Sequence, residues 1–241
     1  MFLVCNWKMN PEKFNEAEKI LSSFKREFAS ISRKSASSPL KSAFKQRKSA
    51  LKLWIAPPSL YFYPLNEKFG KFFDFGLQNI FYEQSGAFTG EISPAMAQDL
   101  GVKFVILGHS ERKKMGEGLE FINKKLLASL KNGLRVILCF GEDKRNIQFV
   151  QKIWENQLKI LLNGVSKNTK NLTLAYEPSW AISSQGIGAA SKEELGFFLK
   201  WYKKTYKFPI FYGGSVNGAI IGEYLGLKFN GYLIGSAGLK S

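Results

Sequence analysis

Short apolar segments recur along this chain and alternate with stretches whose apolar residues are spaced three or four positions apart. The apolar segments predict buried strands at residues 2–6, 51–56, 74–79, 103–108, 134–140, 172–177, 208–212 and 230–235. The stretches between them predict amphipathic helices, for example at residues 11–29, 117–132, 144–163 and 191–206. Strict alternation of strands and helices predicts an α/β fold with a parallel sheet.

Eight strand–helix units within 241 residues favour closure of that sheet into a single barrel. An open, doubly wound sheet is the alternative. However, no GxGxxG follows the first predicted strand, where a dinucleotide-binding sheet would carry it. No linker divides the chain, so we expect one domain over residues 1–241.

The formal net charge of +16 admits nucleic acid, an acidic membrane surface or an anionic metabolite as a partner. Part of this charge lies between Lys25 and Lys52, where nine Lys or Arg residues accompany a single acid, Glu27. Serines are interspersed, and no aromatic interleaving or recognised binding motif accompanies them. We therefore interpret residues 33–50 as an exposed basic insert and expect no dedicated nucleic-acid site there.

No apolar run approaches the length that spans a membrane. The apolar stretch at the N-terminus reaches Asn6 and Lys8 too soon to form the core of a signal peptide. We therefore expect a cytoplasmic protein with no membrane partner. Cys5 and Cys139 each lie inside an apolar strand, where packing explains them better than a disulfide.

In a barrel of this type, the carboxyl ends of the strands carry the functional residues. These ends hold Asn6 and Lys8 after the first strand, His109 after the fourth and Glu177 at the end of the sixth. The last two strands lead into the glycine-rich turns YGGSV at 212–216 and IGSAG at 234–238. Turns at these positions are where such barrels present backbone N–H groups to a phosphate.

Glu177 is followed at once by Pro178 and by a glycine-bearing stretch that runs to Gly188. This order suits a general base with a lid behind it that shields the reaction from water. His109 is the only histidine of the chain, and neither CxxC nor HExxH occurs. We therefore expect no metal site.

The motifs NWKMN, APP, QN with SGAFTGEIS, VILGHSER, YEPSWAI, YGGSV and IGSA occur in this order and include every strand end. Together they resemble the triosephosphate isomerase family from residue 2 to about residue 239. The resemblance implies a single (β/α)8 TIM barrel. It also implies an aldose–ketose isomerase of glycolysis and gluconeogenesis, which interconverts dihydroxyacetone phosphate and D-glyceraldehyde 3-phosphate through an enediol or enediolate intermediate.

The resemblance also implies the catalytic roles, and it implies that no cofactor is needed, because the chemistry is proton transfer alone. Glu177 would shuttle a proton between adjacent carbons, and His109 would polarise the carbonyl and pass protons between its oxygens. Lys8 would supply positive charge, with Asn6 beside it and Glu111 as an orienting partner. A short helix is expected at residues 110–114, and its N-terminal dipole would keep His109 neutral.

The same resemblance assigns residues to phosphate binding, to a lid over the site and to contact with a partner subunit. The residues that would bind the substrate phosphate are Asn6, Lys8, Ser183, Ser215, Gly235 and Ser236. Residues 178–188 would form the lid, with Tyr212 and Ser215 as latch candidates. The segment at 82–90 would dock into a second copy of the chain through Phe88 and Thr89, which implies a homodimer.

Two other interpretations stay open at this stage. The barrel and its phosphate turns could serve the isomerisation of another sugar phosphate, although that alternative must explain Lys8, His109 and Glu177 together. The chain could instead be a non-catalytic binding protein whose basic insert contacts nucleic acid or acidic surfaces. Steep weakening of a complex by salt would identify binding to a phosphate backbone.

Overall fold

The computed structural model describes residues 1–31, 52–145, 148–182 and 188–239. The predicted insert at 33–50 and the predicted phosphate ligand Ser183 lie outside these residues. The described strands form one closed, parallel barrel in chain order, in which the first strand also pairs with the last. These strands are β1 (Phe2–Asn6), β2 (Lys52–Ala56), β3 (Asp74–Leu77), β4 (Phe104–Leu107), β5 (Arg135–Phe140), β6 (Leu172–Tyr176), β7 (Ile210–Tyr212) and β8 (Gly231–Ile234). The prediction of an eight-stranded barrel is confirmed.

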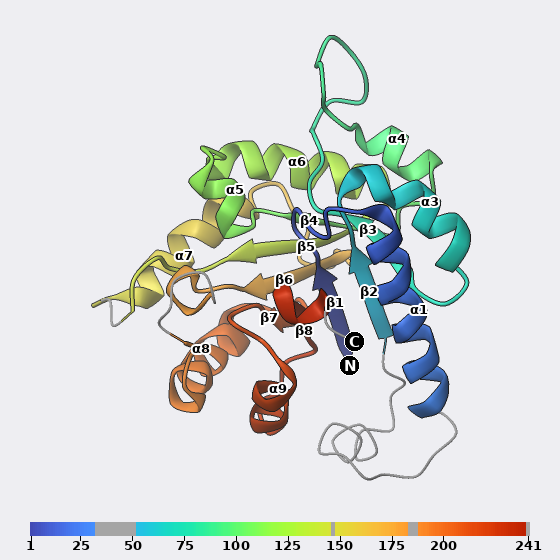
Figure 1. Cartoon of the computed structure of the whole chain (residues 1–241). Coiled ribbons are helices and arrows are strands. Elements are labelled where there is room, and N and C mark those ends of the chain that lie inside the picture. The colour runs from blue at the N-terminus through green and yellow to red at the C-terminus, as the bar shows by residue number, and fades with distance from the viewer. Residues whose placement is uncertain (32–51, 146–147, 183–187, 240–241) are drawn as a thin grey trace.

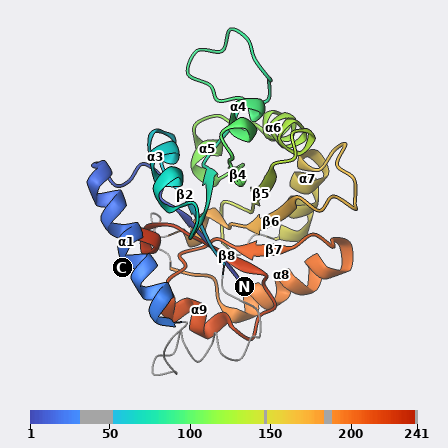
Figure 2. The ribbon, with the colours of Figure 1, turned by 90° about the vertical axis from the view of Figure 1, so that its right-hand side faces the viewer.

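Helices surround the barrel (Figure 2). The described helices are α1 (Phe14–Ile31), α3 (Ser59–Phe69), α4 (Pro94–Asp99), α5 (Ser110–Lys114), α6 (Leu119–Lys131), α7 (Val150–Leu161), α8 (Lys192–Thr205) and α9 (Gly218–Tyr224), with the 3₁₀ turns η1 (Ser179–Ala181) and η3 (Ser236–Leu239). The short helix expected at residues 110–114 is present as α5.

Side chains alternate along each strand, and this alternation separates two apolar cores. The set that points into the barrel forms one cluster, which consists of Val4, Trp54, Ala56, Phe104, Ile106, Ile137, Cys139, Ala175, Phe211 and Leu233. Within it, the rings of Trp54 and Phe104 stack with their centroids 4.9 Å apart. The other set joins the buried faces of the helices in a larger cluster. The barrel is therefore a packed core, and a binding site can form only where the strands end.

Helix α8 shows how the local sequence fixes an element next to the site. Its N-cap is Ser191, whose side chain accepts the N–H of Glu194, while the Glu194 side chain accepts the N–H of Ser191. This capping box satisfies two N–H groups that a helix start otherwise leaves unpaired. It fixes the point at which the chain leaves the lid and enters α8.

One loop stands apart from the rest of the described chain. The segment between β3 and α4, which contains the predicted docking residues Phe88 and Thr89, projects beyond the ring of helices in both views (Figure 1, Figure 2). Both of these residues are exposed, Phe88 with 41% of its surface.

Cys5 and Cys139 are both buried and free, as the sequence predicted. Among the described helices, none combines the length and the apolar character needed to cross a membrane.

Candidate active site

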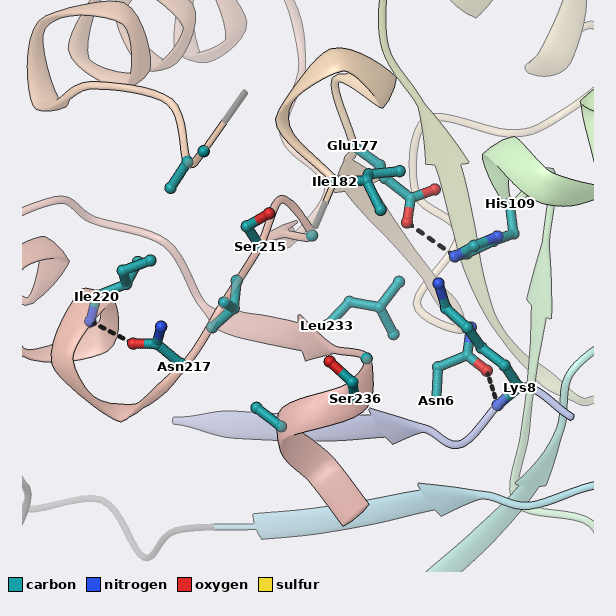
Figure 3. A pocket seen from close by; sticks show the side chains of 16 residues that line it. Asn6, Lys8, His109, Glu177, Ile182, Ser215, Asn217, Ile220, Leu233 and Ser236 are labelled. Atoms are coloured by element: carbon teal, nitrogen blue, oxygen red, sulfur yellow. Dashed lines mark hydrogen bonds and ion pairs between the residues drawn. The ribbon is translucent and has the colours of Figure 1, made fainter. Parts of the chain in front are cut away.

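A cavity of about 490 Å³ opens at the carboxyl ends of the strands. Its lining includes every predicted catalytic or phosphate-binding residue within the described part of the chain except Glu111, namely Asn6, Lys8, His109, Glu177, Ser215, Gly235 and Ser236. Figure 3 shows Lys8, His109 and Glu177 pointing toward one another across it. Residues from both ends of the chain therefore meet at one place.

The carboxylate of Glu177 is buried and engaged on both of its oxygens. Oε1 lies 3.0 Å from Nε2 of His109, and Oε2 accepts the backbone N–H of Ser110 at 3.1 Å. Only 3% of the Glu177 side chain and 7% of the His109 side chain are exposed. A carboxylate held this way is shielded from water, while Glu177 still contributes to the lining of the cavity.

Burial and pairing act on the two groups in opposite directions. Burial raises the pKa of Glu177, but the adjacent His109 and the Ser110 N–H outweigh burial and hold that pKa below its ordinary value. Burial lowers the pKa of His109, but Glu177 and then Glu111 outweigh it and raise that pKa above its ordinary value. Each partner thus favours the charged form of the other.

The start of α5 fixes the orientation of the His109 ring. His109 is the N-cap of this helix, and its Nδ1 accepts the backbone N–H of Glu111 at 3.2 Å. Nδ1 therefore acts as an acceptor, which leaves Nε2 to carry the proton that faces Glu177. This contact favours a neutral ring, whereas Glu177 raises the pKa of the ring, so the expectation that the helix start keeps His109 neutral stays a prediction.

Lys8 has a backbone conformation that is uncommon for a residue with a side chain. Its φ is +56°, in the left-handed region. Its N–H donates to Oδ1 of Asn6 at 3.1 Å, and its ammonium pairs with Oε1 of Glu111 at 2.6 Å. Asn6 and Glu111 thus orient Lys8 from both ends.

Gln78 also holds Lys8, although no role was predicted for it from the sequence. Its Nε2 donates to the carbonyl of Lys8 at 2.8 Å and to that of Ala56 at 2.9 Å. Gln78 directly follows β3, so the rule that strand ends carry function was the available signal.

The turn after β7 is shaped to receive an anion. Ser215 has a left-handed backbone with φ +38°, and its buried hydroxyl oxygen has no hydrogen-bond partner among the described residues. Gly235 and Ser236 line the same cavity after β8. An unpaired buried hydroxyl beside two glycine-rich turns is suited to bind phosphate oxygens.

Tyr212, one of the two predicted latch residues, contacts Ala190, two residues beyond the predicted lid. Its hydroxyl accepts the N–H of Ala190 at 3.1 Å. A Cβ at Gly214 would lie 2.4 Å from that hydroxyl oxygen, so only glycine leaves Tyr212 in this position. Ser215, the other candidate, makes no hydrogen bond to the described lid residues.

The first turn of the predicted lid contacts a buried carboxylate, Glu142, for which the sequence predicted no role. Glu142 follows β5 and accepts hydrogen bonds from Trp154 at 2.6 Å and from Tyr176 and Trp180 at 2.9 Å each. Trp180 belongs to η1, directly after Glu177 and Pro178. Glu142 therefore ties the beginning of the lid to the barrel.

A second buried carboxylate, Glu117, joins α5 to α6. One of its oxygens accepts Lys125 Nζ at 2.6 Å and also pairs with Arg112. Lys125 is 1% exposed and donates in addition to Asn79 at 3.0 Å, while burial lowers its pKa. This cluster holds the short helix that orients His109, and a buried lysine was not predictable from the sequence pattern.

A cavity of about 390 Å³ adjoins the first one on the side of Lys8 and Glu111. Gln78, Met9 and Met115 also line it, and both methionines are largely exposed. Among the residues that the structure describes, no cluster of three His, Cys, Asp or Glu side chains could hold a metal ion.

Comparison with known proteins agrees with this geometry. The family model described as triosephosphate isomerase matches residues 1–241. A triosephosphate isomerase of Aquifex aeolicus is 36% identical over 250 residues, which cover 98% of this chain and 94% of that protein. One from Coprinopsis cinerea is 33% identical over 252 residues, with 99% and 93% covered. One from Carboxydothermus hydrogenoformans is 40% identical over 200 residues, with 77% and 80% covered.

The family match spans the whole chain, and the relatives exceed 30% identity across nearly all of it. The chain belongs to the triosephosphate isomerase family.

Proposed function

We propose that Glu177, His109 and Lys8 carry out the isomerisation of triose phosphates in this chain. As a member of the family, the chain is an aldose–ketose isomerase that interconverts dihydroxyacetone phosphate and D-glyceraldehyde 3-phosphate in glycolysis. The observation that carries the assignment is the contact between Glu177 and His109 at 3.0 Å, buried in the wall of a cavity that also contains Lys8.

Glu177 is the base. Its lowered pKa keeps it ionised near neutral pH, and its position at the end of β6 lets the carboxylate turn into the cavity. It removes a proton from the carbon next to the carbonyl and returns that proton to the neighbouring carbon. Together with the proton transfers between the two oxygens, these steps move the carbonyl group of the substrate by one carbon and consume no other reactant.

His109 and Lys8 act on the carbonyl and hydroxyl oxygens of the substrate. The proton on Nε2 of His109 is donated to the carbonyl oxygen, and the ring then takes a proton from the adjacent hydroxyl. Nδ1 stays an acceptor of the Glu111 N–H throughout. Lys8 supplies fixed positive charge where the enediolate oxygen develops, and its contacts to Asn6 and Glu111 prepare that geometry before substrate binds.

The phosphate group binds at the far side of the cavity, against the backbone N–H groups of Ser215, Gly235 and Ser236. The unpaired Ser215 hydroxyl and the left-handed turn support this placement. Glu142 holds the first turn of the predicted lid through Trp180, and Tyr212 holds Ala190, two residues beyond the lid. The family resemblance assigns the closing of this lid and a phosphate contact from Ser183, and residues 183–187 lie outside the described part of the chain.

We further propose that the enzyme works as a homodimer in the cytoplasm. The projecting loop leaves Phe88 and Thr89 exposed, and the second cavity lies open beside Lys8 and Glu111. A copy of this loop from a partner subunit would bury its apolar side chain there. In a symmetric dimer each subunit would support the active site of the other.

The function is tested by incubating the purified protein with dihydroxyacetone phosphate and following the carbon-bound protons by NMR in D₂O. We expect glyceraldehyde 3-phosphate to form, with deuterium entering at the carbon where Glu177 exchanges its proton. A folded protein that gives neither product nor deuterium exchange would refute the proposal.

A further inference from the structure

Positive charge is concentrated at the end of the barrel opposite the active-site cavity. Because the barrel is closed and parallel, the strand starts all lie at one end, and the strand ends that line the cavity lie at the other. We define the amino-end face as the first residue of each described strand together with the three residues before it. On this face, seven of the eight strands carry an exposed lysine or arginine, namely Lys52, Lys71, Lys103, Arg135, Lys170, Lys207 and Lys228.

This charge is not neutralised locally. The amino-end face holds one acid, Asp74, at the start of β3. Among the residues that the structure describes, none of the seven cations forms an ion pair with a carboxylate. None of them belongs to the basic insert at 33–50. The positive potential of this face is therefore available to a partner.

Two of the cations have a packing role. The guanidinium of Arg135 lies 5.7 Å from the centre of the Trp54 ring, and the ammonium of Lys52 lies 5.6 Å from that of Phe2. Trp54 belongs to the core inside the barrel, and Phe2 packs against that core. These contacts explain Arg135 and Lys52 without a partner, and they do not extend to the other five cations in the described part of the chain.

The core fixes the backbone next to two of those five lysines. Lys103 directly precedes Phe104, and Lys228 directly precedes Phe229. Both phenylalanines are buried, whereas both lysines are exposed. The barrel therefore holds the base of each lysine in place and leaves its ammonium group in solvent.

The composition of the face distinguishes between classes of partner. Within its described residues, Phe72 is the one large apolar side chain that is exposed, at 51%. Binding to a membrane surface would bury several apolar side chains, and protein interfaces have an apolar centre that is poor in lysine. Interfaces with nucleic acid are polar and strongly positive, and their lysines and arginines contact phosphates.

We propose that the amino-end face binds the phosphate backbone of nucleic acid, without selecting a base sequence. Strands β6, β7 and β8 are consecutive neighbours, so Lys170, Lys207 and Lys228 form one continuous row across the face. A phosphate backbone lying along this row contacts them in turn. The isomerase cavity is at the other end of the barrel, so this binding and the proposed catalysis are independent of each other.

The test compares two triple variants of equal net charge. The first removes the row of lysines through Lys170→Gln, Lys207→Gln and Lys228→Gln. The control removes three exposed lysines from the helices α1 and α7, through Lys19→Gln, Lys152→Gln and Lys159→Gln. Both variants keep the basic segment at 33–50, so its contribution is the same in each. Both should fold and keep isomerase activity, because exposed substitutions have little effect on stability.

Binding is measured by the fluorescence anisotropy of a labelled single-stranded DNA of about 20 bases, at salt concentrations between about 50 and 200 mM. Each lost phosphate contact should reduce the slope of log affinity against log salt by about 0.7, so the row variant should lose about 2 from the slope. We expect its Kd at about 0.1 M salt to rise roughly tenfold or more. The control should keep the wild-type slope.

Equal weakening in the two variants would overturn the inference, because overall charge would then account for the binding. Absence of binding by the wild-type protein at about 50 mM salt would overturn it as well. Vesicles that contain phosphatidylserine are the second probe, and tighter binding to them than to DNA would contradict nucleic acid as the partner. An isomerase assay on the same samples tests the proposed function separately.

Discussion

His109 contacts two acidic residues, and each sets a different property of its ring. The backbone N–H of Glu111 makes Nδ1 an acceptor, whereas the Glu177 carboxylate next to Nε2 raises the pKa of the ring. The first contact requires an unprotonated Nδ1 and therefore favours the neutral ring. The second contact acts in the opposite direction and favours the charged ring.

The chain has one histidine, so NMR can follow its titration without assignment. We expect the pKa of His109 in the free enzyme to exceed the ordinary value of about 6.5, and Glu177→Gln to lower it. The folded state then binds this proton more tightly than the unfolded chain. Its stabilising contribution is complete below about pH 6.5 and is lost as the pH rises through the folded-state pKa. A titration that Glu177→Gln leaves unchanged would contradict the pairing.

A second prediction for a single residue concerns Gln78 and its positioning of Lys8. Gln78→Met removes the two bonds to the Lys8 and Ala56 carbonyls, which should let Lys8 relax from its left-handed backbone and lower kcat/KM by roughly tenfold or more. The matched control is Asn123→Leu, which also removes one amide nitrogen bound to two carbonyls, those of Leu161 and Asn163. The assignment is wrong if both variants lose the same fraction of activity.

The site residues differ in how visible they were in the sequence. Asn6, Lys8, His109 and Glu177 could be placed together because each ends or follows a strand, and parallel closure brings all strand ends to one face. The position of Gln78 after β3 marked it as a candidate, but its hydrogen bonds could not be predicted, because the carbonyls of Lys8 and Ala56 approach it only in the closed barrel. The hydrogen bond from the Tyr224 hydroxyl to the Ala190 carbonyl was also not predictable, because α9 and the segment before α8 meet only in the folded barrel.

At the scale of elements, the regular periodicities were reliable and the short or interrupted helices were not. Every strand was predicted within two residues of its bounds. The helix predicted from residue 144 begins only at Val150, because Phe149 has a left-handed backbone with φ +62°. Helix α3 carries an internal proline, Pro64, and α4 and α9 are six and seven residues long. Such segments are too short or too irregular to show a clear period.

The hydrogen bonds of Glu142, which link η1 to the end of β5, give a prediction about stability. Glu142→Leu leaves three buried donors, on Trp154, Tyr176 and Trp180, without an acceptor. We expect the free energy of unfolding to fall by about 2–5 kcal/mol in urea titrations at equal protein concentration. Glu155→Leu is the control, because Glu155 also accepts an indole N–H, from Trp201, but is exposed. An equal loss in both variants would show that burial of Glu142 is unimportant.

At the scale of the whole molecule, net charge and the projecting loop would have opposite effects on the proposed homodimer. A net charge of +16 on each subunit would oppose association, whereas burial of the exposed Phe88 would favour it. The homodimer stays a prediction from the family resemblance. The basic residues at 33–50 would add to the repulsion.

The homodimer can be tested by light scattering combined with activity. We expect an active species of twice the chain mass, whose dissociation constant decreases as salt screens the repulsion. Thr89→Arg should shift the protein toward monomer and lower its activity, since it places a charge in the apolar interface. An active monomer at the assay concentration, or an intact and fully active Thr89→Arg dimer, would contradict this arrangement.

The central claim, that Glu177 is the base of a triose phosphate isomerase, is tested most directly by Glu177→Gln. This substitution keeps the size of the side chain and removes its ability to take a proton. We predict that kcat for dihydroxyacetone phosphate falls by at least about 100-fold, while inorganic phosphate still competes with the substrate, because the turns at Ser215 and Gly235 are untouched. A Glu177→Gln enzyme with near wild-type turnover would contradict the account.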